Sequence, residues 1–242
     1  MTDIKQLLKE FESYAYGQSL HTAFTEMLDW TLLPFKKWDY AEQQNTALEN
    51  YQNHPKVSQL VKLIELIGEA SEGFCDPMGE LYQQVISSGH NGQYFTPEPI
   101  CDMMSLMSAN NLEDGQKVLD PACGSGRMLL AAAKRNRFAI FHGADLDTAC
   151  CKMALLNMLL NSLTGEIAHM NSLSNEFYTG YSVKTSIVNG FHIPFYVEFT
   201  EPELSYIWLH PLKGYTSNTS VNKPLETKIS SHRVTGLQGS LF

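Results

Sequence analysis

The sequence is short of basic residues and of cysteines, and both shortages narrow what the chain can do. It has 17 Lys and Arg against 26 Asp and Glu, which gives a formal net charge of −9. Phosphate contacts need clustered Lys and Arg, so a nucleic-acid partner would require a local basic patch or another subunit. The five cysteines, an odd number, show no Cys-x-x-Cys spacing, which argues against a disulfide framework and against a cysteine metal site. They are Cys75, Cys101, Cys123, Cys150 and Cys151.

Three other common signals are absent. The eight histidines are scattered singly, so the sequence predicts no metal site. The chain opens without an apolar signal segment, and we expect a cytoplasmic protein with no membrane association. There is also no Gly-x-x-x-x-Gly-Lys-Ser/Thr phosphate loop.

The most informative stretch that is present, residues 118–126, is a short apolar run that ends in an acid, a proline and two glycines. It predicts a buried strand followed by a ligand loop. Pro121 cannot continue a sheet ladder, and Gly124 and Gly126 allow backbone conformations that a Cβ would obstruct. Residues 127–137 then predict a helix, so the loop lies at a strand-to-helix crossing, where open α/β sheets bind ligands.

A second predicted strand, 138–144, is followed by Asp145-Leu146-Asp147, about 20 residues after the glycines. At that spacing Asp145 is expected to bind ribose hydroxyls. The alternative, in which Asp147 is the ribose ligand, remains open, although Asp147 fits better as a helix cap. Asp120 would repel a pyrophosphate and attract a cationic ligand. The pattern therefore favours S-adenosylmethionine, which carries an ammonium and a sulfonium.

Two motifs together resemble those of a known family. Gly92-Gln-Tyr-Phe-Thr-Pro97 followed by Asp120-Pro-Ala-Cys-Gly-Ser-Gly126 is similar to the paired cofactor motifs of adenine-N6 DNA methyltransferases, particularly the methylase subunits of type I restriction-modification systems. The resemblance covers about residues 76–173. It implies an α/β, Rossmann-like S-adenosylmethionine-dependent fold and methyl transfer to adenine N6 in DNA. DNA and a specificity or nuclease subunit are the candidate partners.

The resemblance also implies a set of cofactor residues. They are Tyr94, Thr96, Pro97, Asp120, Ala122, Gly124, Gly126, Asp145, Leu146 and Asn171. Thr96 and Pro97 would wrap the methionine portion of the cofactor. Asn171 follows a third predicted strand, 165–170, where the family usually has an Asp that accepts a hydrogen bond from the adenine amino group; the Asn side-chain carbonyl can still accept one.

The family's catalytic tetrapeptide, Asn/Asp-Pro-Pro-aromatic, is absent. The nearest region, 185–196, has an Asn, a Pro and three aromatic residues in a different spacing. Two interpretations stay open: a degenerate loop in which Asn189, Phe191 and Phe195 hold a flipped adenine, or a strand and turn with buried aromatics. The absence also leaves an alternative function open, a catalytically silent cofactor-binding or assembly subunit that acts with a separate catalytic or DNA-reading partner. Methyl transfer to cytosine C5 is disfavoured, because no Pro-Cys dipeptide offers a thiolate nucleophile, and Cys123 is expected to be inert packing.

The domain organisation predicted from these patterns has three parts. Residues 1–90 form a helical N-terminal segment, 91–211 a methyltransferase-like α/β domain, and 212–242 a disordered tail. Within the α/β domain we expect a helix over 99–110, a buried helix over 148–163 between the sheet and the helical segment, and a late strand over 206–209. Because a strand-helix unit takes about 30 residues, the sheet should be truncated on one side.

We make separate predictions for two groups of side chains. The methionines of the 99–110 helix are predicted to lie in the core; they are Met103, Met104 and Met107. Five basic residues have two interpretations, contact with phosphate or a solvated charged face, and the second is favoured; they are Arg127, Lys134, Arg135, Arg137 and Lys152.

Overall fold

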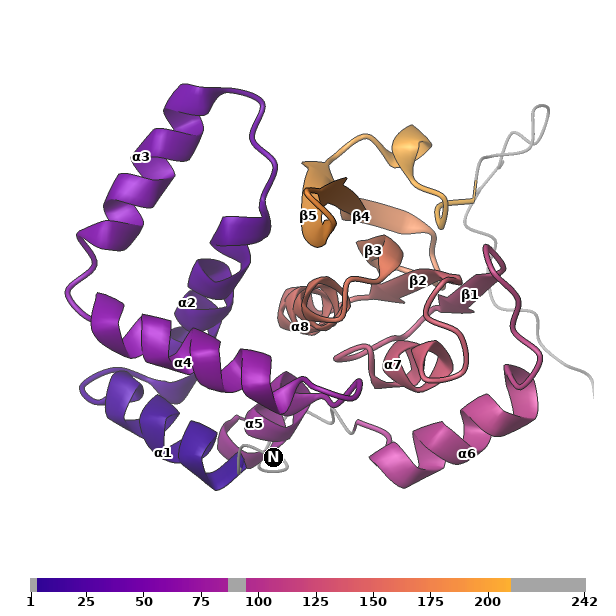
Figure 1. Cartoon of the computed structure of the whole chain (residues 1–242), viewed down its shortest axis with the longest axis horizontal. Helices are drawn as coiled ribbons and strands as arrows, with labels where there is room; N and C mark the ends of the chain where they lie inside the picture. Colours follow the sequence, from indigo (N-terminus) through magenta and orange to yellow (C-terminus); the bar gives the residue numbers. More distant parts are fainter. Residues whose placement is uncertain (1–3, 87–94, 210–242) are drawn as a thin grey trace, which may run out of the picture. The chain divides into compact units, whose positions relative to one another are not determined.

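The N-terminal part of the chain is helical (Figure 1). The computed structural model describes residues 4–86 and 95–209. The helices before the first gap are α1 (Ile4–Ala15), α2 (Leu20–Leu32), the short 3-10 helix η1 (Leu33–Phe35), α3 (Ala41–Gln52), α4 (Val57–Ala70) and α5 (Pro77–Val85). Asp76 caps α5, and Pro77 occupies its first turn.

The second part of the described chain is built on a sheet of five strands in sequence order. The strands are β1 (Lys117–Asp120), β2 (Ile140–Asp145), β3 (Thr164–Asn171), β4 (Glu176–Val188) and β5 (Phe191–Phe199). β1, β2 and β3 are parallel, while β4 and β5 are antiparallel to their neighbours. Helices α6 (Glu98–Ser108), α7 (Arg127–Ala133) and α8 (Thr148–Leu160) accompany it, and α7 and α8 make the crossovers. The predicted α/β, Rossmann-like fold is confirmed.

Helix α8 joins the sheet to the N-terminal helices. Its side chains are buried on nearly every side, and it contacts α2 and α5 on one side and β2 to β5 on the other. This confirms the prediction of a buried helix between the two parts. Within the described ranges, no helix is both long and apolar enough to cross a membrane.

Strand β1 differs from the buried strand that the sequence suggested. Within the described residues it pairs only with β2 and forms an edge of the sheet, with Leu119 56% exposed. No strand among residues 4–86 and 95–209 lies beyond it. The expected truncation of the sheet on one side stays a prediction.

The prediction that the methionines of α6 lie in the core is wrong. Met103, Met104 and Met107 are 54%, 44% and 81% exposed, and only Cys101 and Ser105 of this helix are buried. Helix α6 packs mainly on α7. Because β1 is an edge strand, no further described element covers the methionine side of α6.

The predicted strand over 206–209 is also wrong. Residues 202–204 form the 3-10 helix η2 (Pro202–Leu204), and the segment after it lies on the second face of the sheet. Ile207 and Trp208 pack against Ala144 and Ala168 there. Glu166 on β3 accepts hydrogen bonds from the Ser205 hydroxyl and the Tyr206 N–H, which favours this packing over pairing as a strand.

Candidate functional site

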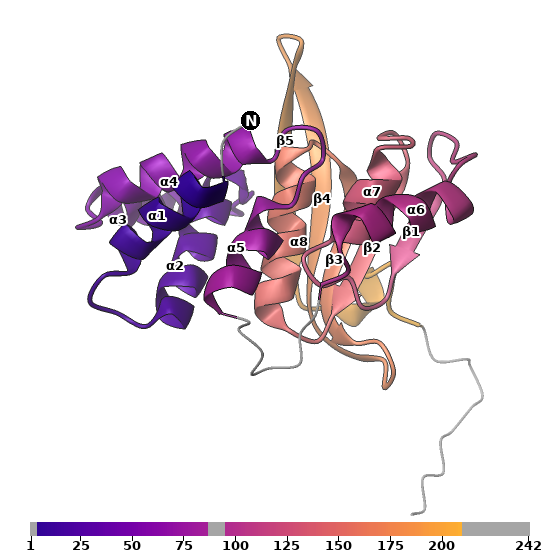
Figure 2. The same ribbon diagram turned by 90° about the horizontal axis from the view of Figure 1, so that it is seen from below.

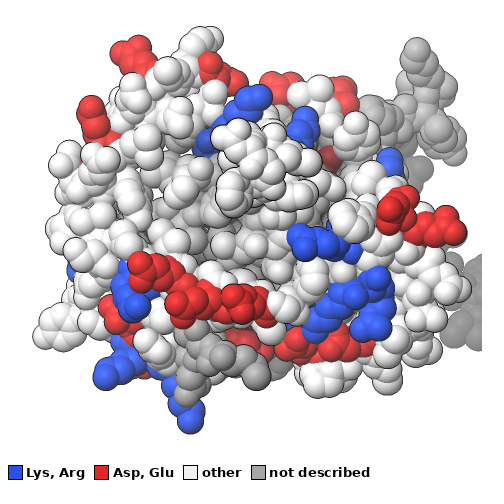
Figure 3. Space-filling view, in the orientation of Figure 1, with Lys and Arg blue, Asp and Glu red and all other residues white. Residues whose placement is uncertain are grey.

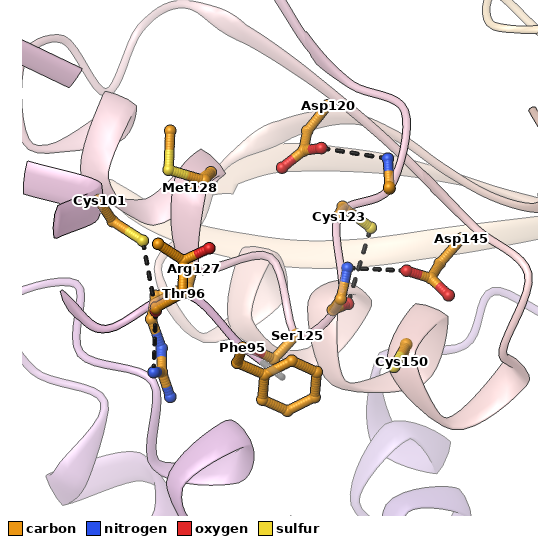
Figure 4. A pocket seen from close by; sticks show the side chains of 12 residues that line it. Phe95, Thr96, Cys101, Asp120, Cys123, Ser125, Arg127, Met128, Asp145 and Cys150 are labelled. Atoms are coloured by element: carbon orange, nitrogen blue, oxygen red, sulfur yellow. Dashed lines mark hydrogen bonds between the residues drawn. The ribbon is translucent and has the colours of Figure 1, made fainter. Parts of the chain in front are cut away.

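A pocket of about 360 Å³ lies at the carboxyl ends of β1 and β2 (Figure 4). It surrounds the loop between β1 and α7, so the predicted ligand loop does border a cavity. The lining residues are Phe95, Thr96, Cys101, Asp120, Ala122, Cys123, Gly124, Ser125, Arg127, Met128, Asp145 and Cys150. The predicted site residues Thr96, Asp120, Ala122, Gly124 and Asp145 are therefore brought together in one place.

The two glycines give the loop its shape. Gly124 and Gly126 have φ angles of 53° and 84°, in the left-handed region that disfavours other residues. A Cβ on Gly124 would lie 3.0 Å from the Phe95 ring, and one on Gly126 would lie 3.1 Å from the Ala154 Cβ. Gly124 therefore lets the segment before α6 approach the loop, and Gly126 lets α7 begin directly against α8.

Asp145 and Asp147 take different roles. The Asp145 carboxylate accepts hydrogen bonds from the N–H groups of Gly124 and Asp147, both at 2.9 Å, and lines the pocket. Asp147 accepts from the N–H groups of Ala149 and Cys150 and caps α8. The cap role expected of Asp147 is confirmed, while a ribose contact from Asp145 stays a prediction.

Asp120 is a half-buried carboxylate with few hydrogen-bond donors to offset its burial. The described residues form no salt bridge with it and make one hydrogen bond to it, from the Ala122 N–H at 3.1 Å. Burial raises the pKa of Asp120, and the nearby Asp145 carboxylate raises it further. A cationic group bound in the pocket would stabilise the ionised form.

Behind the loop lies another carboxylate, which is buried and accepts several hydrogen bonds. Asp76, only 5% exposed, accepts hydrogen bonds from the Ser125 hydroxyl at 2.5 Å, the Arg127 Nε at 2.9 Å and the Asn157 Nδ2 at 2.8 Å. It also accepts one from the Gly79 N–H. A single side chain thus ties the start of α5 to the ligand loop, to α7 and to α8.

Arg127 extends this network to the second motif. One of its terminal nitrogens donates to the Thr96 carbonyl at 3.2 Å, the other to Glu80 at 3.1 Å, and its guanidinium carbon lies 6.0 Å from the centroid of the Phe95 ring. The interpretation of Arg127 as a solvated residue is wrong, because it is only 6% exposed and paired with Asp76. The Thr96 segment is therefore held against the glycine loop by a buried ion pair.

The other four basic residues fall into two groups. Lys134 pairs with Glu98 and Asp102, and Lys152 pairs with Asp29. Arg135 and Arg137 are exposed, as predicted. Sequence reasoning missed the role of Asp76, because its partners Ser125, Arg127 and Asn157 lie far along the chain.

Of the predicted cofactor residues that the structure describes, four do not line the pocket: Pro97, Gly126, Leu146 and Asn171. Tyr94 lies outside the described residues. Pro97 stands at the start of α6, and Leu146 is 60% exposed. The side-chain carbonyl of Asn171 accepts hydrogen bonds from the backbone N–H groups of residues 173 and 174, in the turn after β3.

The cysteines at the pocket are not activated. Burial raises the pKa values of the Cys123 and Cys150 thiols, and all five cysteines of the chain are free. A thiol that is held protonated is a poor nucleophile. Cys123 thus has the properties of the inert packing residue that the sequence analysis expected.

The three predicted catalytic residues lie on the β4–β5 hairpin, away from the pocket. Asn189 and Gly190 form its turn with φ angles of 51° and 82°, and Phe191 is 74% exposed. The start of β4 pairs with the end of β3 near the pocket, whereas the end of β4 runs past the start of β3. Figure 2 shows the hairpin extending beyond the other strands. Phe195 pairs with Lys184 in the part of the hairpin that passes that opposite end.

Asn189 therefore has a structural explanation. A two-residue hairpin turn of type I′ needs positive φ at both central residues, and Asn-Gly is the preferred pair for such a turn. The Asn-Gly dipeptide between two strand-like runs was the sequence signal for this turn. The structure does not bring Asn189, Phe191 or Phe195 to the candidate pocket.

Comparisons with known proteins place the chain among DNA methylases. A sequence profile of the family described as N-6 DNA Methylase matches residues 73–203. The chain is 23% identical over 169 residues to the type I restriction enzyme MpnII methylase subunit of Mycoplasma pneumoniae, covering 63% of this chain and 30% of that protein. It is 26% identical over 150 residues to the MjaVII methylase subunit of Methanocaldococcus jannaschii, covering 57% and 24%. The match thus spans less than a third of the length of these relatives.

Two solved structures also match. One, assigned to the class I S-adenosylmethionine-dependent methyltransferases, comes from Listeria monocytogenes; it is 16% identical with a TM-score of 0.41, and 68% of this chain and 52% of that chain are covered. The other is a type I restriction-modification methyltransferase subunit from Streptococcus thermophilus. It is 17% identical with a TM-score of 0.33, and 66% of this chain and 37% of that chain are covered.

Proposed function

The chain belongs to the N-6 DNA methylase family, and we propose that it binds S-adenosylmethionine between the ends of β1 and β2 and takes part in methyl transfer to adenine N6 in DNA. The observation that carries the proposal is the pair of carboxylates, Asp120 and Asp145, on either side of the glycine loop in one pocket (Figure 4). Adjacent parallel strands place such groups where open α/β sheets bind nucleosides.

The pocket fits this cofactor in size and in charge. Its volume of about 360 Å³ lies within the range of small-molecule sites. Asp120 has only the Ala122 N–H as a hydrogen-bond donor within the described residues, and burial disfavours its ionised form. The ammonium of S-adenosylmethionine would offset that burial, whereas an anionic ligand would worsen it.

Each residue of the pocket then has a distinct part. Asp120 binds the cationic end of the ligand, and Asp145, oriented by the Gly124 N–H, accepts from ribose hydroxyls. Gly124 permits a close approach of the ligand to the loop backbone, and Phe95 supplies an apolar wall. When bound, S-adenosylmethionine supplies the methyl group that is transferred.

The groups that hold the adenine are proposed to come from another subunit. The sequence has no Asn/Asp-Pro-Pro-aromatic tetrapeptide, and the nearest candidates lie on the far hairpin. On the face seen in Figure 3, Lys and Arg are interspersed with Asp and Glu, so this face supplies no continuous basic surface for DNA. Two relatives are named as methylase subunits of type I restriction enzymes, which supports a multi-subunit assembly.

Calorimetric titration with S-adenosylmethionine tests the cofactor assignment. We expect the wild-type chain to bind and Asp120→Asn to bind at least about tenfold more weakly, a loss of about 1.4 kcal/mol. The control is Glu203→Gln, which removes an exposed carboxylate outside the pocket and should leave the affinity unchanged. Absence of binding by folded wild-type protein would overturn the proposal.

Methyl transfer is tested separately with labelled cofactor and unmethylated DNA. Incorporation of label into adenine N6, in the presence of the partner subunit, is the expected result. Label found only in cytosine, or in no base, would contradict the assigned reaction.

A further inference from the structure

A second pocket, of about 410 Å³, lies at the opposite end of the sheet from the proposed cofactor site. The cofactor site is at the carboxyl ends of β1 and β2, whereas this pocket includes Thr164 at the start of β3. Its other walls come from the loop between α7 and β2, the end of α8 and the β4–β5 hairpin. The proposed methyl transfer at the first pocket does not use this one.

The hairpin forms one wall of the pocket because it extends past the rest of the sheet. The last register pair between β3 and β4 joins Gly165 to Val183, whereas β4 and β5 stay paired as far as Val188 with Phe191. Figure 2 shows this projection. The end of the hairpin is therefore free to contact another molecule.

The two faces of the hairpin differ in what they border. Successive side chains of a strand point to opposite faces, so Thr185 and Ile187 share a face. His192 lies on the same face, because it is the register partner of Ile187. All three residues line the pocket, while Phe191 lies on the opposite face.

Two large apolar side chains at the pocket are exposed. Phe138 is 66% and Ile187 is 68% exposed. Neighbouring exposed apolar side chains of this kind mark interaction sites. Small-molecule sites bury most of the ligand inside the pocket, which would leave these two side chains in water. A polypeptide segment that crosses the pocket would cover both of them, so it is the class of ligand that fits.

The polar part of the lining offers hydrogen-bond donors and a positive charge. It contains the guanidinium of Arg137 and the imidazole of His192, and no described Asp or Glu lines the pocket. Arg137 makes one described hydrogen bond, from Nη2 to the Asn161 carbonyl at 2.9 Å, and a guanidinium has five N–H donors. Residues 177–197, which include most of the hairpin, contain no Asp or Glu. This charge pattern is complementary to a carboxylate.

Two hydroxyl groups of the lining have no role in the fold. The Thr185 Oγ1 is buried and has no hydrogen-bond partner among the described residues, which costs free energy. Ser162 has a φ of 51° just after the C-terminal cap of α8, a position where glycine is preferred. Glycine would form this turn with less strain. A ligand that accepts hydrogen bonds would use both hydroxyls.

We propose that this pocket binds an acidic segment of a partner protein, with an aliphatic or aromatic side chain against Phe138 and Ile187 and a neighbouring carboxylate on Arg137. Nucleic acid fits less well, because phosphate contacts need clustered Lys and Arg and Arg137 is the only such residue among the described lining. A second copy packed hairpin to hairpin would place like charges together, which is unfavourable. The proposal goes beyond the proposed function and does not depend on the cofactor assignment.

The test begins with selection from a random peptide library displayed on phage, with the full-length chain as the target. Peptides that also bind Ile187→Glu are removed, so that the remaining ones need this surface. We expect them to be enriched in Asp or Glu next to a large apolar residue. No enrichment, or enrichment in Lys and Arg instead, would overturn the proposal.

The dissociation constant of a selected peptide, measured by fluorescence anisotropy, locates the contact. We expect it to rise at least about tenfold for Arg137→Glu and for Phe138→Ser. Replacing the carboxylate of the peptide by Lys should restore binding to Arg137→Glu and abolish binding to the wild type, because the ion pair is then formed in reverse. Absence of this restoration would overturn the assigned contact between Arg137 and the carboxylate.

The matched controls make the same changes outside the pocket. Arg135→Glu reverses the charge of an exposed arginine, and Phe191→Ser removes an exposed aromatic ring from the other face of the hairpin. Both should leave the dissociation constant unchanged. Ser162→Gly should weaken binding while it raises the midpoint of thermal unfolding, which a purely structural serine would not do. If the controls weakened binding as much as Arg137→Glu did, or Ser162→Gly did not weaken it, the proposal would fail.

Other occupants give different results, and each would overturn the proposal. If single-stranded or duplex oligonucleotides displaced the peptide at equal concentration, the ligand would be a nucleic acid. If light scattering showed that the wild type self-associates and Ile187→Glu does not, a second copy would be the occupant. Binding of S-adenosylmethionine is measured independently and should be unchanged in Arg137→Glu, so a chain that binds the cofactor but no peptide refutes this inference and leaves the proposed function intact.

Discussion

Two carboxylates, Asp76 and Asp120, border the same loop and differ in how many hydrogen bonds they accept. Asp76 is 5% exposed and accepts hydrogen bonds from Gly79, Ser125, Arg127 and Asn157. Asp120 accepts only one hydrogen bond from the described residues. A buried charge costs free energy unless it is paired. The first carboxylate is satisfied by the protein and holds the loop in place, whereas the second is left for a ligand to satisfy.

The largest expected effect is on stability, at Asp76. Asp76→Ala leaves Arg127 as a buried charge without this partner and should lower the free energy of unfolding by about 3–5 kcal/mol, measured by urea denaturation. Asp114→Ala, which removes an exposed acid that accepts a hydrogen bond from Asn136, should cost less than about 1 kcal/mol. A loss at Asp76 no larger than at Asp114 would show that the two carboxylates do not differ in the proposed way.

The next effect is on cofactor binding, at Asp120. Asp120→Asn should weaken S-adenosylmethionine binding by about tenfold to a hundredfold, the effect of removing a charge-assisted contact of about 1.5–3 kcal/mol. The free protein should not lose stability, because burial disfavours the ionised carboxylate that the change removes. Calorimetry and thermal unfolding measure the two effects. If Asp120→Asn lowered the stability and left the affinity unchanged, Asp120 would be a structural carboxylate like Asp76.

A third prediction concerns pH. The pKa of Asp120 is raised in the folded chain, so its contribution to stability is present at low pH and is lost as the pH rises through the folded pKa. Binding of a cation has the opposite dependence, because it needs the ionised form. Affinity for S-adenosylmethionine should therefore fall as the pH is lowered from about 7 toward about 4. The pH dependence should be weaker in Asp120→Asn, and an equal dependence in both proteins would assign it to another group.

The smallest effect separates Asp145 from Asp147. Asp147→Ala removes the cap of α8 and should cost about 1 kcal/mol of stability with little change in affinity. Asp145→Ala should weaken cofactor binding clearly more than Asp147→Ala does. A larger loss of affinity at Asp147 would favour the alternative in which it is the ribose ligand.

The prediction of the loop succeeded because its signals are local. A glycine with positive φ after a strand, and an Asp that caps the next helix, depend on neighbouring residues alone, and both features are present at Gly124 and Asp147. The apolar run of α8 likewise predicted a helix buried on both sides. The Asn189-Gly190 turn was equally local, and its signal was available in the sequence.

Other expectations failed because they depended on distant parts of the chain. Arg127 is buried because Asp76, 51 residues earlier, lies beside it. Met104 and Leu119 are exposed because no described strand covers the outer side of β1. Whether a charged or an apolar side chain is buried depends on which elements meet at it.

The sequence by itself thus determined the α/β alternation, the glycine loop and the carboxylates at the ends of two neighbouring strands, since these follow from residue type and short-range spacing. Only the tertiary structure decided that Asp76 is paired while Asp120 accepts a single hydrogen bond from the described residues, and that no described strand pairs with the outer side of β1. Hydrogen bonds and strand pairing between residues far apart in the chain settle those points, and no short stretch of sequence contains both partners.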